Sequence, residues 1–380
     1  MMLRRRHLPA ALAALGTGPA SAQGAAFAPR APLARIDARV DRLIDIAVCT
    51  RPFRAQGPRL EAERLGRQVV IHNYGHGGSG WSLSWGAAQA AVALALATRE
   101  KRLAVIGAGA IGLTTARVAQ RAGLKVRIVC DELPPAVRSS AATGVWSPDS
   151  RVCTDEHATP DFVQRWEAMA RASFRRYQSL LGLPGAPVEW HEGYVLSDRP
   201  FGEPLPPAPE TASEPDYPDL ADRLRDLHPR SVALEPGQHP FPVPHVRRYV
   251  QLVFNLPAYT GWLLDGFFAE GGTVERRHFE HPRQFGTLPE RVLVNATGWG
   301  ARALLGDTSL VPVRGQTARL LPQPEVDHGI TWRGHNLWVV PRRDGILVQA
   351  QAAGDFGSAD TTPDRAASEA AVRRLATLYT

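Results

Sequence analysis

The order of apolar and polar residues predicts alternating strands and helices over the first third of the chain. Short apolar runs, typical of buried strands, occur at 44–49, 69–71, 103–106 and 125–129. Two of these runs end in glycine-rich loops, and each loop leads into a segment of helical periodicity, at about 81–98 and 111–122. Repeated units of strand, glycine loop and helix predict an α/β domain with a parallel sheet.

The rest of the chain has a less regular pattern. Helical periodicity recurs at 161–181, 259–271 and 365–379, and strands are predicted at 291–295, 313–320 and 337–349. Seven prolines fall between Pro200 and Pro218, which predicts a loop at that point. We interpret residues 200–244 as a solvated surface insertion, with an active-site lid or an interface as the alternative.

Composition narrows the class of protein. The 380 residues suffice for two or three domains of about 150 residues each, and 44% hydrophobic with 21% charged residues is typical of a globular protein. The net charge of +7 suggests a nucleic-acid partner, but three of these charges are Arg4, Arg5 and Arg6. The chain has no basic run interleaved with aromatic residues, so no nucleic-acid partner is expected.

The first residues predict an export leader. Adjacent arginines precede a mildly apolar stretch, Leu8 to Leu15, and Ala20-Ser21-Ala22 is typical of a signal cleavage site. This layout is similar to a twin-arginine signal, so we assign residues 1–22 to the signal and expect a periplasmic protein. If the start is only an Arg- and Ala-rich disordered segment, the protein is cytoplasmic. No apolar run reaches the ~20 residues of a membrane span, so the mature protein is expected to be soluble.

Neither cysteines nor histidines predict a metal site. Cys49, Cys130 and Cys153 have no metal-ligand spacing, so we expect packing roles for them. His72 and His76 lack an acidic or cysteine partner at ligand spacing, and we interpret them mainly as loop-stabilising residues.

One motif indicates a bound dinucleotide. Gly107-Ala108-Gly109-Ala110-Ile111-Gly112 has the G-x-G-x-x-G spacing, follows a predicted strand and opens a predicted helix. The glycines permit a tight turn, close approach of a pyrophosphate and close packing of helix on strand. Asp131, 24 residues after Gly107, is placed to accept hydrogen bonds from the adenosine ribose. An acid there favours NAD or FAD over NADP, and the motif does not choose between these two.

Several further segments resemble the motifs of the D-amino-acid oxidase family. They are Ser139-Ser140-Ala141-Ala142-Thr143-Gly144-Val145-Trp146-Ser147-Pro148, Val294-Asn295-Ala296-Thr297-Gly298, Arg314-Gly315-Gln316 and Val70-Ile71-His72-Asn73-Tyr74-Gly75-His76-Gly77-Gly78. The resemblance implies FAD as cofactor and an α/β fold, in which a Rossmann-like FAD-binding domain with a parallel sheet is interleaved with a mixed-sheet α+β substrate domain. It assigns residues 99–150 and 285–320 to the FAD-binding domain, and residues 151–284 and 321–380 to the substrate domain.

The order of these segments differs from the family pattern. In the family, the strand with the substrate arginine and the His-Asn-Tyr-Gly loop close the chain, whereas here residues 44–98 precede the G-x-G-x-x-G strand. We therefore predict a circular permutant in which residues 99–102 join the former ends. Such a permutation requires that the helix at 365–379 ends near the strand at 44–49.

The resemblance also implies roles for individual residues. The glycine loop would wrap the flavin and offer backbone N–H groups to its pyrimidine ring, through Gly77, Gly78, Ser79, Gly80, Trp81 and Ser82. Further FAD contacts are implied at Ser139, Thr143, Gly144, Val145 and Thr297. Arg51 matches the arginine that binds the substrate carboxylate, with Arg54 as its competitor. Trp338 stands where a pocket tyrosine is expected, and Gly334 roughly where the second would be, so Arg51, Gly78 and Trp338 are the candidates at the reacting centre.

This resemblance implies an FAD-dependent oxidoreductase that acts on the amino group of an amino acid, and the expected substrate is a D-amino acid. Hydride would pass to flavin N5, and oxygen would be the acceptor. The alternatives are an oxidase of glycine, sarcosine or another amine, a dehydrogenase with another acceptor, and a flavin-binding protein without turnover.

Overall fold

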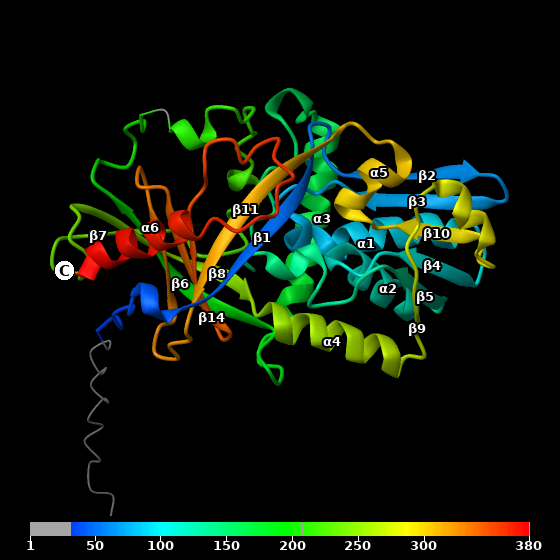
Figure 1. The fold of residues 1–380 in the computed structure, drawn as a ribbon, viewed down its shortest axis with the longest axis horizontal. Coiled ribbons are helices and arrows are strands. Elements are labelled where there is room, and N and C mark those ends of the chain that lie inside the picture. Colours follow the sequence, from blue (N-terminus) through cyan, green and yellow to red (C-terminus); the bar gives the residue numbers. More distant parts are fainter. Residues whose placement is uncertain (1–31, 207, 380) are drawn as a thin grey trace, which may run out of the picture. The chain divides into compact units, whose positions relative to one another are not determined.

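Two β-sheets organise the part of the chain that the computed structural model describes, residues 32–206 and 208–379 (Figure 1). One has the strand order β2-β3-β10-β4-β5-β9, and the other has the order β1-β11-β14-β13-β12-β6-β8-β7. The strands are β1 (Leu43–Arg54), β2 (Arg59–Leu65), β3 (Gln68–Tyr74), β4 (Arg102–Ile106), β5 (Lys125–Cys130), β6 (Val188–Ser197), β7 (Val232–Leu234), β8 (His245–Phe254), β9 (Thr273–Arg276), β10 (Val292–Asn295), β11 (Leu310–Leu320), β12 (His328–Trp332), β13 (Leu337–Arg342) and β14 (Gly345–Gln349).

Helices cover both sheets. The α-helices are α1 (Gly80–Ala97), α2 (Ala110–Arg121), α3 (Pro160–Gln178), α4 (Leu256–Ala269), α5 (Ala301–Leu305) and α6 (Arg365–Ala376). Short 3-10 helices are η1 (Val40–Arg42), η2 (Arg138–Ala141), η3 (Asp155–His157), η4 (Pro209–Thr211), η5 (Ala221–Leu224), η6 (Pro282–Thr287), η7 (Gly298–Gly300) and η8 (Thr377–Tyr379).

The six-stranded sheet is the Rossmann-like part of the fold. Neighbouring strands from β3 through β10, β4 and β5 to β9 are parallel, and β2 pairs antiparallel at the edge. Leu103 and Val105 of β4 pack in the hydrophobic cluster formed with α1 and α2, while Ala104 and Ile106 pack in a second cluster formed with η6 and α5. Because both faces are buried, these strands are continuous apolar runs, which is why the sequence reveals them.

The eight-stranded sheet joins segments that are far apart in the sequence. β1 pairs antiparallel with β11, with Cys49 opposite Gly315, and the two strands lie side by side in Figure 1. β12 pairs parallel with β6, while the other neighbouring strands are antiparallel. A mainly parallel sheet with one antiparallel edge strand, beside a mixed sheet, confirms the predicted fold class.

Sheet membership differs from the domain division expected from the sequence. β9 falls in a range assigned to the substrate domain but belongs to the six-stranded sheet, and β11 falls in an FAD-domain range but belongs to the eight-stranded sheet. Residues 44–98 contribute β1 to one sheet and β2 and β3 to the other. The strand expected at 337–349 is a pair of antiparallel strands, β13 and β14. Pairing between distant segments decides sheet membership, and the position of a motif along the chain does not specify it.

The proline-rich insertion is partly buried, so the interpretation of a solvated segment is wrong for several of its residues. Leu220 and Leu224 pack beside Trp166 of α3 in one hydrophobic cluster, and Phe241 and Val243 are buried as well. Proline prevents regular hydrogen bonding but does not prevent apolar side chains between the prolines from being buried. Proline content alone therefore does not predict that these apolar residues of the insertion are buried.

Two expectations concern the chain's location. The leader predicted at 1–22 lies outside the described residues. Within the described ranges, no helix combines the length and the apolar character that crossing a bilayer demands. The three cysteines are free and buried, which agrees with a packing role.

Candidate active site

A cavity of about 1060 Å³ is lined by residues of both sheets. Its loop end is formed by the glycine loops after β3 and β4 and by the segments after β5, β9 and β10. Its sheet end is formed by side chains from β1, β8, β11, β12, β13 and β14. Small-molecule sites usually span ~300–1000 Å³, so this cavity has room for a large cofactor together with a substrate.

The loop after β4 has the conformation that its motif predicts. Gly107 has a φ of +104°, and a Cβ there would lie 2.7 Å from the carbonyl oxygen of Ala296. A Cβ on Gly112 would overlap the carbonyl of Gly107, so this glycine packs helix against loop and does not line the cavity. The remaining motif residues, Ala108, Gly109, Ala110 and Ile111, do line it.

The N-terminus of α2 points into this loop end. Gly109 is its N-cap residue, and the hydroxyl of Ser139 accepts a hydrogen bond from the Ala110 N–H at 3.0 Å. Free N–H groups and the helix dipole at such a terminus favour an anionic phosphate. The sequence predicted Ser139 as a cofactor contact; it lines the cavity and also caps the helix.

Asp131 lines the cavity where β5 ends, as predicted. Its carboxylate lies 2.9 Å from Nδ1 of His278, on the segment after β9. Both side chains are exposed, so a ribose can approach Asp131 from the cavity. His278 carried no signal in the sequence, because only the pairing of β9 with β5 brings it to this position.

The glycine loop after β3 is fastened to two other segments. The Gly77 N–H donates to the carbonyl of Pro52 at 2.9 Å, and the Gly78 N–H donates to the carbonyl of Ser150 at 3.0 Å. A Cβ on Gly77 would overlap the carbonyl of Arg151. Both glycines line the cavity, but their N–H groups are occupied, so these two N–H groups are not the free donors that were expected for the flavin ring.

The start of α1 supplies the open donors instead. The first backbone bond of this helix runs from the Leu83 N–H to the Ser79 carbonyl at 2.9 Å. The N–H groups of Gly80, Trp81 and Ser82 precede that bond and make no backbone hydrogen bond within the described residues. Gly80 and Trp81 line the cavity, so the positive end of this helix lies beside it.

Two predicted residues of this loop are supporting residues. The Ser79 hydroxyl donates to the carbonyl of His76 at 2.7 Å, and the Ser82 hydroxyl accepts from the Ser147 N–H at 2.8 Å. Both serines are buried and neither lines the cavity. They hold the loop and the helix start in place.

The other predicted cofactor contacts line the cavity as expected: Thr143, Gly144, Val145 and Thr297. Gly144 has a φ of +80°, and a Cβ there would lie 2.5 Å from the carbonyl of Phe254. The Thr297 hydroxyl donates to Oδ1 of Asn295 at 2.8 Å, which fixes the turn after β10. These residues act through a shaped backbone more than through free side chains.

The geometry distinguishes Arg51 from its competitor Arg54. Arg51 lines the sheet end, and its guanidinium lies over Gly315, where a Cβ would be 2.5 Å from Nη1. Its Nη1 donates to the carbonyl of Arg314 at 3.0 Å, and no carboxylate within the described chain pairs with it. Arg54 does not line the cavity: its Nε donates to Ser309 at 2.8 Å and lies 3.7 Å from Asp307. Arg51 is therefore the arginine with donors left for an anion.

Trp338 lies on the cavity wall, as predicted, while Gly334 does not line the cavity. Trp338 pairs with Thr331 on one side and with Gln349 on the other, and Gln349 in turn pairs with Thr317. The four residues form one row across β12, β13, β14 and β11, and all four line the cavity. Only sheet register brings them together.

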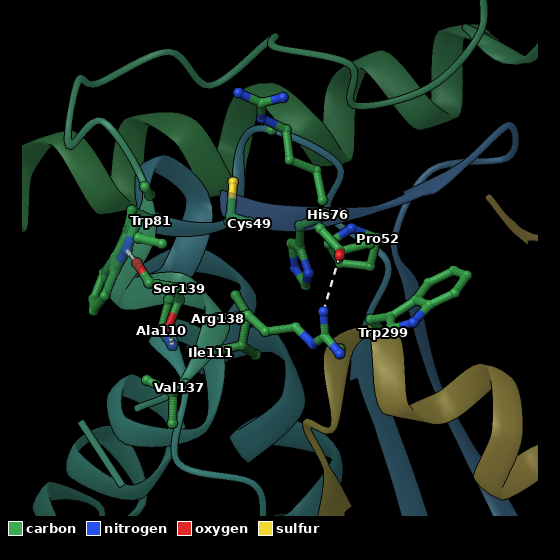
Figure 2. Close-up of a pocket in the computed structure, with 18 of the residues that line it drawn as sticks. Cys49, Pro52, His76, Trp81, Ala110, Ile111, Val137, Arg138, Ser139 and Trp299 are labelled. Carbon is green, nitrogen blue, oxygen red and sulfur yellow. Dashed lines mark hydrogen bonds between the residues drawn. The ribbon is translucent and has the colours of Figure 1, made fainter. Parts of the chain in front are cut away.

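The sequence did not single out Arg138, which lies in the middle of the site. Figure 2 shows its side chain extending from η2 toward β1, where Nη1 donates to Oγ1 of Thr50 at 2.9 Å. Arg138 lines the cavity and has no carboxylate partner among the described residues. A fixed cation of this kind favours a bound anion.

His72 and His76 have different environments. His72 is buried in β3, where its Nε2 lies 3.0 Å from Glu63 and its Nδ1 accepts from Asn295 at 3.2 Å. This confirms a stabilising role, although the residue belongs to the strand. His76 lines the cavity, and its Nε2 is buried and has no hydrogen-bond partner among the residues that the structure describes. Burial lowers the pKa of His76 to about 3, so its ring is neutral at neutral pH.

A further arginine, Arg151, lines the cavity and is held by the proline-rich insertion. Its Nε and Nη2 bind Glu214 at 2.9 and 2.7 Å, and Nη2 also donates to Gln351 at 3.0 Å. Glu214 is almost fully buried, with 5% of its side chain exposed. This ion pair fixes the insertion against the wall and neutralises the charge of Arg151.

The residues at the loop end fit FAD. Two helix N-termini and the cation of Arg138 suit a pyrophosphate, Asp131 suits a ribose, and the glycines leave room for close approach of a large ligand. Within residues 32–206 and 208–379, no group of three His, Cys, Asp or Glu side chains is placed to hold a metal ion.

Comparison with known proteins agrees with this geometry. The family model described as FAD dependent oxidoreductase matches residues 102–380. A protein named D-amino-acid oxidase from Rubrobacter xylanophilus is 30% identical over 285 residues, which cover 73% of this chain and 77% of the relative. A protein of the same name from Streptomyces coelicolor is 28% identical, covering 74% and 78%. The crystal structure of a glycine oxidase from Bacillus cereus matches with a TM-score of 0.50 and 16% identity, covering 73% of this chain and 78% of that one, and so supports the fold alone.

Proposed function

Because the chain belongs to the FAD-dependent oxidoreductase family, we propose that it oxidises D-amino acids to imino acids and passes the electrons to oxygen. Membership of the family shows that the protein is an FAD-dependent oxidoreductase similar to D-amino-acid oxidase. The configuration of the substrate and the acceptor are the proposed parts. The observation that carries the proposal is that Arg51, the unpaired cation of the sheet end, shares one cavity with the FAD-binding loops.

Each end of the cavity has a separate task in this reaction. The Arg51 guanidinium binds the substrate carboxylate and fixes the α-carbon relative to the loop end, so that positioning carries most of the catalysis. The flavin of bound FAD supplies the hydride acceptor. The N–H groups at the start of α1 and its helix dipole favour the negative charge that develops when the cofactor is reduced. The neutral His76 ring adds no competing charge to this wall.

The test is an anaerobic titration of the purified holoprotein with matched D- and L-amino acids, followed by the flavin absorption near its visible maximum. Bleaching by D-amino acids but not by their L-enantiomers supports the proposal, and bleaching by L-amino acids alone contradicts it. A second measurement compares peroxide formation in air with reduction of an artificial dye. Fast dye reduction without peroxide would replace oxygen by another acceptor.

A second candidate remains an oxidase of glycine or of a secondary amine. Trp338 and Gly334 stand where tyrosines are expected, so the wall over the substrate differs from the family pattern. Sarcosine and glycine in the same titration separate this candidate from the first.

We also propose that the chain is a circular permutant with an export leader. The short distance between the two ends of the described chain supports this proposal, since the Arg35 guanidinium lies 5.6 Å from the Tyr379 ring centroid. A variant in which residues 34–98 follow residue 379 through a short linker tests the permutation. If the proposal is right, this variant folds and binds FAD; an insoluble product with no flavin would count against it. The leader stays a prediction that fractionation of expressing cells would test.

A further inference from the structure

The sheet end contains a polar floor built on two glycines. Gly193 of β6 and Gly329 of β12 are register partners in the eight-stranded sheet. A Cβ on Gly193 would overlap the ring of Tyr249, and a Cβ on Gly329 would lie 2.7 Å from Nε2 of Gln251. The side chain of Tyr249 therefore lies directly on the backbone of β6, and that of Gln251 extends to the backbone of β12, the strand beyond β6. Both side chains line the cavity.

This floor continues the row of Thr331, Trp338 and Gln349. Tyr249 pairs with Gly193 across β8 and β6, and Gly329 is two residues before Thr331 on β12, so the floor and the row lie on the same face of the sheet. The sheet end thus gathers a phenol, a hydroxyl and two amides beside one indole. Most small-molecule sites are lined mainly by apolar groups, with few polar ones to set specificity.

Several of these polar groups have hydrogen-bonding capacity left. The Tyr249 hydroxyl donates to Oε1 of Gln251 at 3.4 Å, which leaves the Gln251 amide NH₂ without a partner among the described residues. The side chain of Gln349 lines the cavity and makes no hydrogen bond within the same residues. Burial raises the pKa of Tyr249, so the phenol keeps its proton; the proton is directed at Gln251, and the hydroxyl oxygen is left as an acceptor.

The charges of the protein around the floor disfavour a substrate whose own side chain is charged. Among the described residues, the carboxylates that line the cavity are Asp131, Glu132 and Glu280, and all belong to the loop end. At the sheet end Arg51 is left for the α-carboxylate, and Arg151 is already paired with Glu214. Arg138, which reaches Thr50 of β1, is assigned to the cofactor phosphates and is not left for a substrate side chain. A second carboxylate or an ammonium group on the substrate would be buried without a counter-charge.

We propose that Tyr249, Gln251 and Gln349 select substrates whose side chain is polar and uncharged, an amide or a hydroxyl. This inference rests on the proposed function, because it assigns the substrate class of the same site. A wall of unsatisfied donors and acceptors discriminates strongly against an apolar isostere, since the isostere leaves the buried polar groups unpaired. Asparagine and leucine have side chains of nearly the same shape, so this pair isolates hydrogen bonding from size.

Ligand binding tests the inference without turnover. Succinamate, 4-methylpentanoate and succinate are the carboxylates that correspond to asparagine, leucine and aspartate without the amino group. Their dissociation constants are measured on the holoprotein through the change in flavin absorption. We expect succinamate to bind at least about tenfold tighter than either of the others, which corresponds to roughly one hydrogen bond to a buried group. Equal binding of succinamate and 4-methylpentanoate, or tightest binding of succinate, overturns the inference.

Variants assign the effect to residues. Gln251→Leu and Tyr249→Phe should reduce the preference for succinamate about tenfold while the flavin spectrum and the FAD content stay unchanged. Gln164→Leu, at an exposed glutamine of α3 outside the cavity, is the matched control and should leave the preference intact. A preference that survives both cavity variants contradicts the assignment.

Turnover separates this inference from the proposed function. In the reductive half-reaction, D-asparagine should have a higher kcat/KM than D-leucine in the wild type, and Gln251→Leu should remove the difference mainly through KM. If no D-amino acid reduces the flavin, the proposed function fails, but the order of carboxylate binding still decides the inference. If D-leucine is the better substrate, the proposed function stands and the inference fails.

Discussion

The two ends of the cavity are built in different ways. The loop end uses short contiguous segments, in which glycines and helix N-termini present backbone groups to a ligand. The sheet end uses single side chains from six strands that are spread from residue 43 to residue 349. A backbone site tolerates few substitutions, because its geometry depends on the absence of a Cβ. A site built from side chains can change its specificity by single substitutions. Trp338 and Gly334, which stand where the family pattern has tyrosines, are differences of this kind.

The largest effect is expected at the sheet end, from Arg51→Ala. Loss of a bidentate carboxylate contact, in which charge-assisted hydrogen bonds contribute about 1.5–3 kcal/mol each, should raise the KM about a hundred- to a thousandfold. The FAD dissociation constant should stay within about twofold, and Arg51→Lys should recover only part of the loss because a lysine lacks the planar fork. Steady-state kinetics and fluorescence titration with FAD measure the two quantities. A KM that does not change would remove Arg51 from the site.

At the loop end, Gly107→Ala should act on the cofactor instead. A side chain at φ +104° and 2.7 Å from the Ala296 carbonyl introduces strain and a clash together, so we expect the FAD dissociation constant to rise about thirtyfold or more. Gly123→Ala is the matched control, since Gly123 also has a positive φ of 84° but no atom within 4 Å. The control should lower the melting temperature slightly and leave FAD binding intact. Equal loss of FAD in both variants would mean that strain alone, without the contact, explains the effect.

Where the two ends of the cavity meet, the contacts of Arg151 are expected to stabilise the folded protein. The carbonyl of Arg151 packs against Gly77, while its side chain binds Glu214. Glu214→Gln leaves the guanidinium, with 20% of its side chain exposed, without a charged partner, and should lower the free energy of unfolding by about 2 kcal/mol at pH 7. Glu203→Gln, at an exposed position of the same insertion, should have no measurable effect. Chemical denaturation measures both variants.

The loss of folding stability in Glu214→Gln should depend on pH. Burial would raise the pKa of Glu214, but the hydrogen bonds and charge of Arg151 outweigh burial and lower it. A carboxylate with a lowered pKa in the folded state stabilises the protein fully above its unfolded value of 4.5, and this stabilisation is lost as the pH falls through the folded value. The stability difference between wild type and Glu214→Gln should therefore be constant near neutral pH and shrink below about pH 4.5. A difference that grows in acid would contradict this sign.

The smallest expected effect is that of Arg138→Ala. One lost charge-assisted hydrogen bond to a phosphate should raise the FAD dissociation constant about tenfold and reduce its dependence on salt, while the KM of the substrate changes little. Arg283→Ala, an exposed arginine outside the cavity, is the control. If Arg138→Ala changes the KM and not the affinity for FAD, Arg138 acts on the substrate at the sheet end and not on the cofactor at the loop end.

Local patterns in the sequence predicted the loop end well. The G-x-G-x-x-G segment, the acid at Asp131 and the glycine loop before α1 were placed at one cavity, because each is a continuous stretch whose conformation depends on its own residues. The same reading assigned Gly77 and Gly78 as N–H donors to the flavin, which is wrong because Pro52 and Ser150 from other segments take those hydrogen bonds. His278 and Arg138 were missed because strand pairing and the fold of η2, not a motif, bring them to the site.

The sequence by itself determined the class of fold and the cofactor loops, and its motif reduced the candidates for the substrate arginine to Arg51 and Arg54. These features depend on residues that are close along the chain, where glycine conformation, helix N-termini and apolar runs act locally. Only the tertiary structure decided between Arg51 and Arg54, because Asp307 and Ser309 occupy the second arginine from the turn before β11. It alone also placed Tyr249 and Gln251 on a glycine floor, since the register of β6, β8 and β12 determines which side chains share one face.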